Sequence, residues 1–247
     1  MGSLDWLTIR PVAHRGLHDA AAGIIENTPS SVAAAIAGGY GIEVDLQITA
    51  DGEAMVFHDR QLGRLIEGEA RLDSLPAAEL KRLPYIATSD RMMTLGELCE
   101  LVAGRATLIL ELKSRFDPDP RLPLKVAEVL KGYAGPVAVM SFDPAQMLVM
   151  RHVAPHLPRG LVAERTYRPG HQNWAPLVRS WLGLLLQAVR SGPQFLAYSV
   201  KDLPSFEPLA ARYALRMPLL TWTVRTAEDR ARATRWADQM IFEGFRP

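Results

Sequence analysis

The sequence has 247 residues, 48% of them hydrophobic, and a formal net charge of +1. This length is ample for a buried core and suits one large domain or two small ones. Charged residues are spread along the chain, which argues against a basic stripe for nucleic acid or a polybasic patch for membranes.

The chain shows no sign of secretion or membrane insertion. Cys99 is the single cysteine, so no internal disulfide can form. It shares a helical face with Leu95 and Leu98, which indicates a small core residue. Residues 1–16 lack the pattern of a signal peptide, and the apolar run 181–189 is too short to span a bilayer. We expect a cytoplasmic protein. The sequence does not indicate its oligomeric state.

Eight short apolar runs are predicted to be strands. In chain order they are 8–13, 41–47, 107–113, 136–141, 159–164, 195–200, 219–224 and 239–243. Segments with helical periodicity lie between most of them, at 29–38, 121–132, 144–152, 174–190, 205–214 and 226–236. Alternating strands and helices indicate parallel βαβ units, and eight units predict an α/β fold of the TIM-type (β/α)8 barrel. The rival is an open doubly wound sheet, but its G-x-G-x-x-G turn is absent.

The connection after the second predicted strand is unusually long. Residues 48–106 exceed an ordinary βα loop, so we expect a small insertion at the barrel mouth, with helices at 76–83 and 94–104. No linker or repeat divides the chain, and residues 1–247 are expected to form one domain. The apolar segment 174–190 is expected to be an outer helix; a lid or a lipid-facing surface is the alternative.

The second and third strands carry acidic residues on one face. Side chains alternate along a strand, so Glu43 and Asp45 share the face opposite Val44. Glu111 has the same position near the carboxyl end of its strand, where barrel enzymes place their chemistry. Inward carboxylates repel each other and are costly to bury, and one divalent cation would offset both costs. Oxygen ligands favour Mg²⁺ or Ca²⁺ over zinc.

An Asp-Gly pair after the acidic strand predicts a hairpin. With Asp51 and Gly52 as its two central residues, paired positions sum to 103, and Asp45 lies opposite His58. Asp59 then either orients the imidazole or caps the next loop. The hairpin in either case returns His58 to the acidic strand.

The first strand ends in the tripeptide His14-Arg15-Gly16. The guanidinium of Arg15 suits a phosphate, and Gly16 allows a sharp turn or a close approach to a ligand. Together with Lys113, these groups can neutralise a phosphoryl group. Two histidines near neutral pKa can serve as general base and general acid. The set therefore predicts cleavage of a phosphodiester.

The ordered motifs resemble the glycerophosphodiester phosphodiesterase family. The resemblance covers most of the chain through A-H-R-G (13–16), E-N-T (26–28), E-V-D (43–45), H-D (58–59) and E-L-K (111–113), with M-S-F-D (140–143) and T-W-T-V (221–224) as further strand-end elements. It implies a metal site formed by Glu43, Asp45 and Glu111, and it implies His14 and His58 as the acid/base pair. It implies Arg15 and Lys113 as contacts to the phosphate or glycerol of a small-molecule phosphodiester.

Three further positions are less settled by the resemblance. Glu26 is expected to reach the metal or to form a hydrogen bond beside it. Asn27 is expected to position this shell, with a contact to the substrate or a place in the N-cap region of the following helix as the alternatives. Trp222 either lines the glycerol or head-group pocket or packs inside the barrel.

The chain also departs from the family pattern near its end. Arg225 stands where Asn often follows W-T-V, and Phe242-Glu243 replace a small polar and acidic pair. These departures do not involve the predicted metal ligands, but they leave the specificity for the head group undetermined. The expected reaction gives an alcohol and glycerol 3-phosphate. The alternatives are a metal-dependent sugar-phosphate isomerase or lyase, and a non-catalytic barrel that binds phospholipid head groups.

Overall fold

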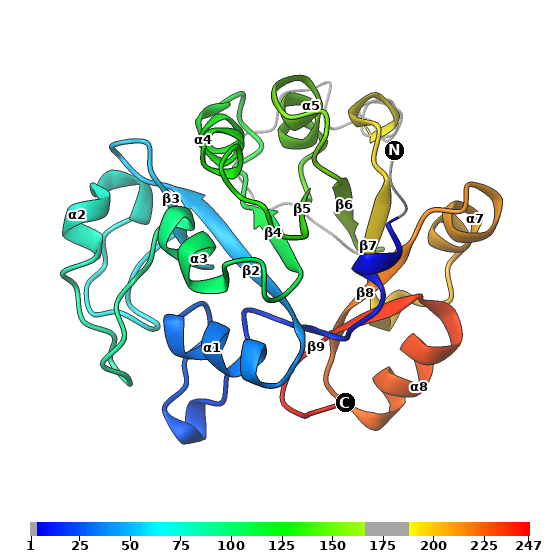
Figure 1. Ribbon diagram of the computed structural model, residues 1–247, viewed down its shortest axis with the longest axis horizontal. Coiled ribbons are helices and arrows are strands. Elements are labelled where there is room, and N and C mark those ends of the chain that lie inside the picture. The colour runs from blue at the N-terminus through cyan, green and yellow to red at the C-terminus, as the bar shows by residue number, and fades with distance from the viewer. Residues whose placement is uncertain (1–3, 166–187) are drawn as a thin grey trace.

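The computed structural model describes residues 4–165 and 188–247, whose strands form a closed barrel (Figure 1). Its parallel strands are β1 (Val12–Ala13), β2 (Gly41–Ile48), β4 (Leu108–Leu112), β5 (Val137–Ser141), β6 (Arg159–Ala163), β7 (Phe195–Ser199), β8 (Leu219–Val224) and β9 (Gln239–Phe242). They pair in the order β1-β9-β8-β7-β6-β5-β4-β2, and pairing of β1 with β2 closes the ring. The predicted TIM-type barrel is confirmed.

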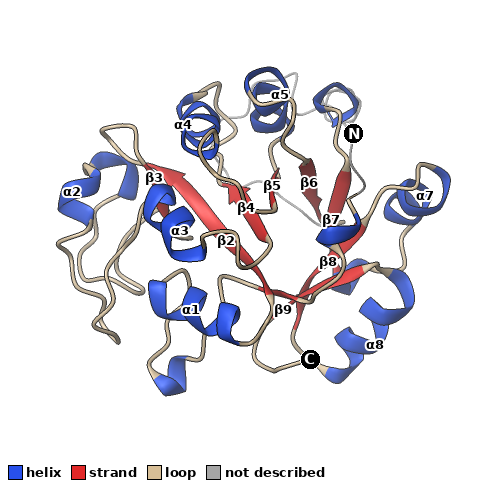
Figure 2. Ribbon diagram, in the orientation of Figure 1, coloured by secondary structure: helices blue, strands red, loops and turns tan. Residues whose placement is uncertain are grey.

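Helices form a layer outside the strands (Figure 2). Within the described residues they are α1 (Pro29–Ala37), α3 (Leu95–Val102), α4 (Arg121–Leu130), α5 (Pro144–Val153), α7 (Phe206–Ala214) and α8 (Ala227–Trp236). Three of them begin at a threonine whose side chain closes a capping box, at Thr28, Thr94 and Thr226. The helix expected over 174–190 falls almost entirely within 166–187, outside the described residues.

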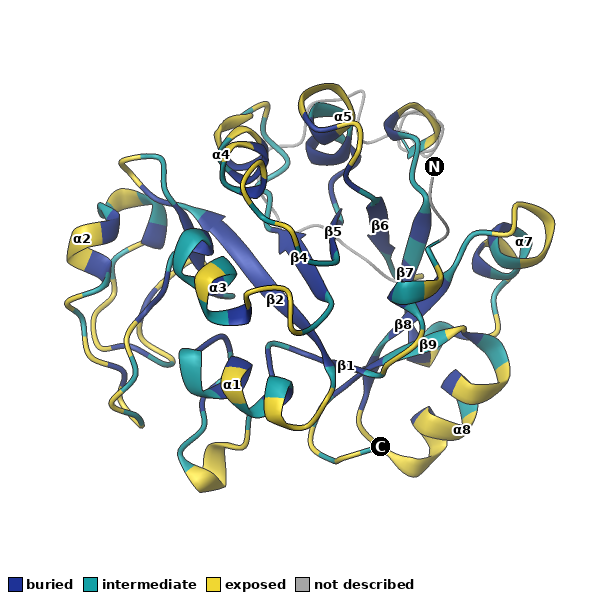
Figure 3. Ribbon diagram, in the orientation of Figure 1, coloured by how far each residue is buried: buried dark blue, intermediate teal, exposed yellow. Residues whose placement is uncertain are grey.

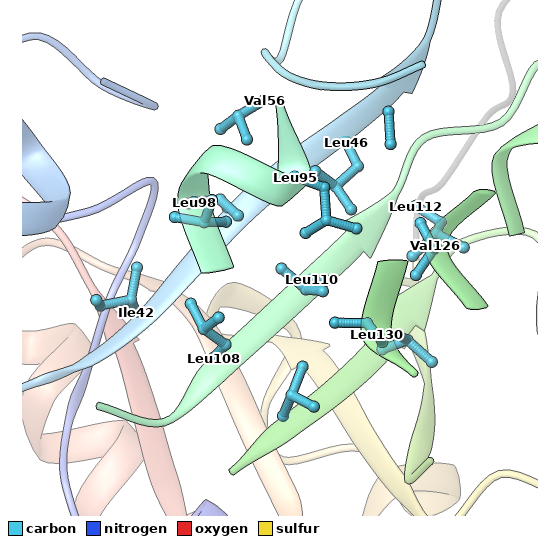
Figure 4. Packing of buried hydrophobic residues seen from close by; sticks show 14 of the residues in the cluster. Ile42, Leu46, Val56, Leu95, Leu98, Leu108, Leu110, Leu112, Val126 and Leu130 are labelled. Atoms are coloured by element: carbon cyan, nitrogen blue, oxygen red, sulfur yellow. The ribbon is translucent and has the colours of Figure 1, made fainter. Parts of the chain in front are cut away.

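Two apolar layers hold the barrel together. Between strands and helices, the outward residues of β2 and β4 pack against α3 and α4, as Leu46, Leu110 and Leu95 show in Figure 4. Inside the barrel, Ile109 belongs to a second cluster that includes Leu7 from the 3-10 helix η1 (Asp5–Leu7). The strands are therefore buried on both faces, as Figure 3 shows. This leaves the inward positions near the strand ends for polar side chains.

A segment between β2 and α3 has a small core of its own. It contains β3 (Ala54–Val56), η3 (Leu72–Ser74) and α2 (Ala77–Leu80). Its buried cluster includes Ile66, Leu80 and other apolar residues outside the barrel wall. Helix α3 lies within the predicted range 94–104 and packs on α1 and the outer core.

The predicted register of the Asp-Gly hairpin is wrong by one residue. Strands β2 and β3 pair Leu46 with Val56, so paired positions sum to 102 rather than 103. The Thr49 and Glu53 backbones close the loop, and Gly52 takes a positive φ of 85°. This is a three-residue turn with glycine in the left-handed region, which adds one residue to the expected two. Asp45 therefore faces Phe57, and His58 lies one residue beyond.

The first strand is also shorter than the predicted 8–13. Only Val12–Ala13 pair in the sheet, because the chain before them folds into η1 and a turn. Leu7 of η1 and Val12 of β1 both belong to the inner apolar cluster. The short strand still brings His14 to the mouth, since Ala13 pairs with Ile42 on one side and Phe242 on the other.

Candidate active site

Three carboxylates meet inside the barrel mouth. Glu43 and Asp45 are 1% exposed, Glu111 is also buried, and one oxygen of each lies within 4.8 Å of the others. Sheet register explains the cluster, because Asp45 on β2 pairs directly with Glu111 on β4. Glu43 lies two residues earlier on the same inward face. The structure thus brings together the three residues predicted as metal ligands.

The charges of this cluster are unevenly compensated. Lys113 Nζ lies 2.8 Å from Asp45 and 2.7 Å from Glu111. Burial opposes ionisation of Asp45, but Lys113 and Arg15 outweigh it and hold its pKa well below the usual range. Burial, followed by repulsion from Asp45 and Glu111, raises the pKa of Glu43 well above its usual value. Of these three carboxyls, Glu43 is the one that forms no ion pair with a lysine or arginine side chain of the described residues.

The donor set fits a divalent cation. Glu43 Oε1 is buried and has no hydrogen-bond partner in the described parts of the chain. Three oxygen donors around one point, with Glu43 Oε1 lacking both a hydrogen bond and an ion pair among the described residues, match the preference of Mg²⁺ and Ca²⁺ for carboxylates. Glu43, Asp45 and Glu111 are therefore the residues that could hold such an ion.

Arg15 bridges the first loop to the acidic cluster. Its backbone N–H donates to Glu43 Oε2 at 3.0 Å, and its Nε lies 3.3 Å from Asp45 Oδ2. This backbone has a positive φ of 56°. Gly16 follows at φ 79°, and a Cβ there would lie 2.4 Å from Ser31 Oγ. Gly16 therefore allows the loop to pack closely against α1.

Asn27 orients a metal-ligand candidate. Its Nδ2 donates to Asp45 Oδ2 at 2.8 Å, while its Oδ1 accepts from the Asp45 backbone N–H at 3.2 Å. Asn27 is buried and precedes Thr28, the N-cap of α1. Glu26 points elsewhere: it accepts from Arg15 Nη1 at 2.7 Å and from Arg64. Of its two expected roles, the structure shows the hydrogen bond beside the site.

The two candidate histidines are each held by a carboxylate through Nδ1. His14 Nδ1 lies 2.8 Å from Glu243 Oε2, and His58 Nδ1 lies 2.8 Å from Asp59 Oδ1. Asp59 therefore orients the imidazole, one of its two expected roles. His14 is buried, and burial lowers its pKa despite the hydrogen bond that the ring makes to Glu243. His58 is about one third exposed.

The loop that carries His58 is anchored by an inward residue of β2. Gln47 Nε2 donates to the backbone carbonyls of Phe57, His58 and Asp59, at 3.3, 2.9 and 2.5 Å. Gln47 follows Glu43 and Asp45 at the strand period of two. The same face of β2 therefore supplies two carboxylates and the amide that fixes the second histidine's backbone.

Trp222 lies in β8, two residues before the strand ends, and is partly buried. Its Nε1 donates to Ala197 O at 3.1 Å, and its ring meets Phe142 edge-on with centroids 5.5 Å apart. It packs on the inner cluster while part of its surface stays exposed. Both expected roles of Trp222, pocket wall and packing residue, are thus compatible with its position.

Sequence reasoning missed two charged residues beside the histidines. Glu243 was read only as a departure from a motif, yet it contacts His14 across 229 positions of sequence. Its place at the carboxyl end of the last strand was the available signal. Arg64 carried no such signal: it lies in the inserted segment and binds Asp59 at 2.6 Å and Glu26 at 2.7 Å. Arg64 thus connects Asp59, the partner of His58, to Glu26, the partner of Arg15.

Of the remaining histidines, His18 lies near the mouth, with its Nε2 4.0 Å from Glu243 Oε2. His152 and His156 are exposed, and His171 is outside the described residues. Cys99 packs against the outer core, as expected, and burial raises its pKa to about 11.

Comparison with known protein families shows which family this chain belongs to. The sequence model of the Glycerophosphoryl diester phosphodiesterase family matches residues 14–245, which includes every candidate residue above. The chain belongs to this family. The predictions of the family and of a phosphodiesterase activity are confirmed. A glycerophosphodiester phosphodiesterase of Caldanaerobacter subterraneus is 28% identical over 90% of this chain and 88% of its own.

Solved structures of the family share the barrel. A phosphodiesterase of Oleispira antarctica, solved with the product sn-glycerol-3-phosphate, has a TM-score of 0.78 at 20% identity and covers 96% of this chain and 93% of its own. The glycerophosphodiester phosphodiesterase of Thermotoga maritima has a TM-score of 0.72 at 21% identity, with 94% of both chains covered. At these identities the likeness supports the fold. Separately, none of the helices in the described segments is both long and apolar enough to cross a bilayer.

Proposed function

We propose that this phosphodiesterase hydrolyses glycerophosphodiesters to an alcohol and glycerol 3-phosphate, using one divalent cation and two histidines. The observation that carries the proposal is the buried carboxylate cluster with His14 and His58 held beside it. The product seen with the Oleispira enzyme agrees with this chemistry. The substrate is a small phosphodiester; the cytoplasmic location stays a prediction.

The cation would be held by Glu43, Asp45 and Glu111. When bound, it supplies positive charge that stabilises the phosphoryl oxygens as negative charge develops on them. Mg²⁺ and Ca²⁺ are both compatible with three oxygen donors. Arg15 and Lys113 border the same cluster and contribute two further positive charges for the phosphate.

His14 is suited to accept a proton from the attacking hydroxyl. Burial lowers its pKa, which favours the neutral ring. Its Nδ1 is engaged with Glu243, while Nε2 lies on the side of the cluster, 3.9 Å from Glu43 Oε2. His58, paired through Nδ1 with Asp59, would then protonate the leaving oxygen. The attacking group is a hydroxyl of the substrate glycerol, which gives a cyclic phosphate first, or water.

The test is release of glycerol 3-phosphate from glycerophosphocholine with Mg²⁺ or Ca²⁺, and its loss with a chelator. A panel of head groups that includes lysophospholipids then defines specificity. His152→Ala, on an exposed helical histidine, is the matched control for the His14 and His58 variants. An isomerase or lyase would leave the diester intact, and a head-group-binding barrel would bind it without turnover.

A further inference from the structure

Two residues that the proposed reaction does not use lie directly behind His14. Glu243 Oε2 is 2.8 Å from His14 Nδ1, and Arg225 Nη2 donates to the same oxygen at 2.9 Å. These are the positions at which the sequence departs from the family pattern. The structure shows that the two departures are partners in one ion pair at the barrel rim.

Sheet geometry brings these residues together. Strand β1 pairs Ala13 with Phe242 of β9, so His14 and Glu243 each follow a paired residue and emerge side by side. The backbone N–H of His14 also donates to Phe242 O at 2.9 Å. On the other side, the Glu243 N–H donates to Val224 O at 3.0 Å, and Arg225 follows. Three neighbouring strand ends thus place a ring, a carboxylate and a guanidinium in a row.

The carboxylate determines which ring nitrogen carries the proton. Burial opposes ionisation of Glu243, but its hydrogen bonds to His14 and Arg225 lower its pKa to about 2. An ionised carboxylate only accepts hydrogen bonds, so Nδ1 of His14 must be the donor. In the neutral ring, Nε2 then keeps its lone pair, on the side of the acidic cluster. A general base requires this tautomer.

The second histidine repeats the arrangement. His58 Nδ1 contacts Asp59 Oδ1, and Asp59 Oδ2 accepts from Arg64 Nε at 2.6 Å. Each candidate histidine is therefore held through Nδ1 by a carboxylate that also binds an arginine. For His14 these partners follow β9 and β8, and for His58 they lie in the loop after β3. Because the same arrangement occurs at both histidines, it indicates that the carboxylates serve to hold the rings and are not chance surface ion pairs.

We propose that Glu243, held by Arg225, is the positioning residue that fixes the Nδ1–H tautomer of His14 and aims its Nε2 at the substrate. This inference rests on the proposed function, in which His14 transfers a proton. Glu243 touches no reacting atom; it acts through the ring and stabilises the imidazolium that forms when Nε2 takes up a proton.

The first experiment measures kcat and KM for glycerophosphocholine in full-length variants. Glu243→Gln keeps the shape but loses the charge, and kcat should fall about 10–100-fold with KM changed less than about threefold. Glu243→Asp should recover part of the loss, and Arg225→Ala should lower kcat by about 2–10-fold. Glu228→Gln and Arg235→Ala, both exposed on α8, are controls expected to match wild type. An unchanged kcat in Glu243→Gln, or an equal loss in the controls, would overturn the proposal.

The second experiment reads the tautomer without catalysis. Long-range ¹H–¹⁵N spectra of the cation-free protein, with the His14 signals assigned by their loss in His14→Gln, should show the Nδ1–H form. In Glu243→Ala the population should move toward Nε2–H. A wild-type ring in the Nε2–H form would refute the proposal, even if the enzyme is active. If wild type released no glycerol 3-phosphate while the ring was Nδ1–H, the proposed function would fail and the geometric assignment of Glu243 would stand.

Discussion

Glu43→Gln is expected to stabilise the cation-free protein while weakening its response to cation. The carboxylate oxygens of Glu43, Asp45 and Glu111 lie within 4.8 Å of one another. At an effective dielectric constant of about 20, two unit charges at that distance repel by roughly 3.5 kcal/mol. Lys113 and Arg15 offset part of this repulsion. Above the raised pKa of Glu43, where the carboxyl is ionised, we therefore expect the free energy of unfolding to be about 1–3 kcal/mol higher in the variant.

The gain should depend on pH in a defined direction. Burial and the neighbouring carboxylates raise the pKa of Glu43 above its ordinary value of 4.5. The folded state then binds this proton more tightly than the unfolded state does. The stability of cation-free wild type should fall as pH rises from 4.5 through the raised pKa. Glutamine does not titrate, so the advantage of the variant should grow over the same interval.

The cation should stabilise wild type more than the variant. At a concentration 100 times Kd, an ion that binds only the folded state stabilises it by about 2.7 kcal/mol. If the substitution weakens binding about 100-fold, the same concentration gives the variant only about 0.4 kcal/mol. The decisive quantity is thus the difference between unfolding with chelator and unfolding with Mg²⁺ or Ca²⁺.

The assay is urea unfolding followed by circular dichroism between pH 5 and 8, with calorimetry for cation affinity. Glu100→Gln, on an exposed position of α3, is the matched control and should follow wild type in both arms. A cation-free Glu43→Gln protein less stable than wild type, or one with undiminished cation affinity, would show that Glu43 is not a repelled metal ligand.

Three further outcomes are expected. His58→Ala should lower kcat about 10²–10⁴-fold with the circular dichroism spectrum retained, and activity near wild type would remove His58 from the reaction. Gly16→Ala should lower both the thermal midpoint and activity, because a Cβ would lie 2.4 Å from Ser31 Oγ at a φ of 79°; an unchanged melting curve would contradict this packing. Cys99 should react with iodoacetamide at pH 8 roughly 100-fold more slowly than an unfolded thiol, since its pKa is raised to about 11 from 9.0; equal rates in native buffer and in urea would argue against the burial of its thiol.

The barrel and the acidic cluster were predictable because their signals are local. Alternation along β2 separates Glu43 and Asp45 from Val44 whatever the rest of the chain does. The same rule places Glu111 inward on β4, and parallel strands bring their carboxyl ends to one rim. Neighbouring strands then need only the expected order to bring the carboxylates together.

The hairpin shows where local signals fail. Asp51-Gly52 correctly predicted a turn, but a two-residue and a three-residue loop differ by one residue of register. Hydrogen bonds between Thr49 and Glu53 decide between them. These bonds depend on the side chain of Thr49 as well as on the turn residues, and the dipeptide alone carries no information about them.

The amino-acid sequence alone thus determined the strand faces, the acidic set and the two histidines, since each follows from backbone geometry over a few residues. Only the tertiary structure decided what lies behind the histidines. Closure of the barrel sets β9 beside β1 and brings Glu243 to His14, and the inserted segment folds Arg64 onto Asp59. Such contacts depend on where separate elements meet and how far their side chains reach, and no spacing along the chain specifies either.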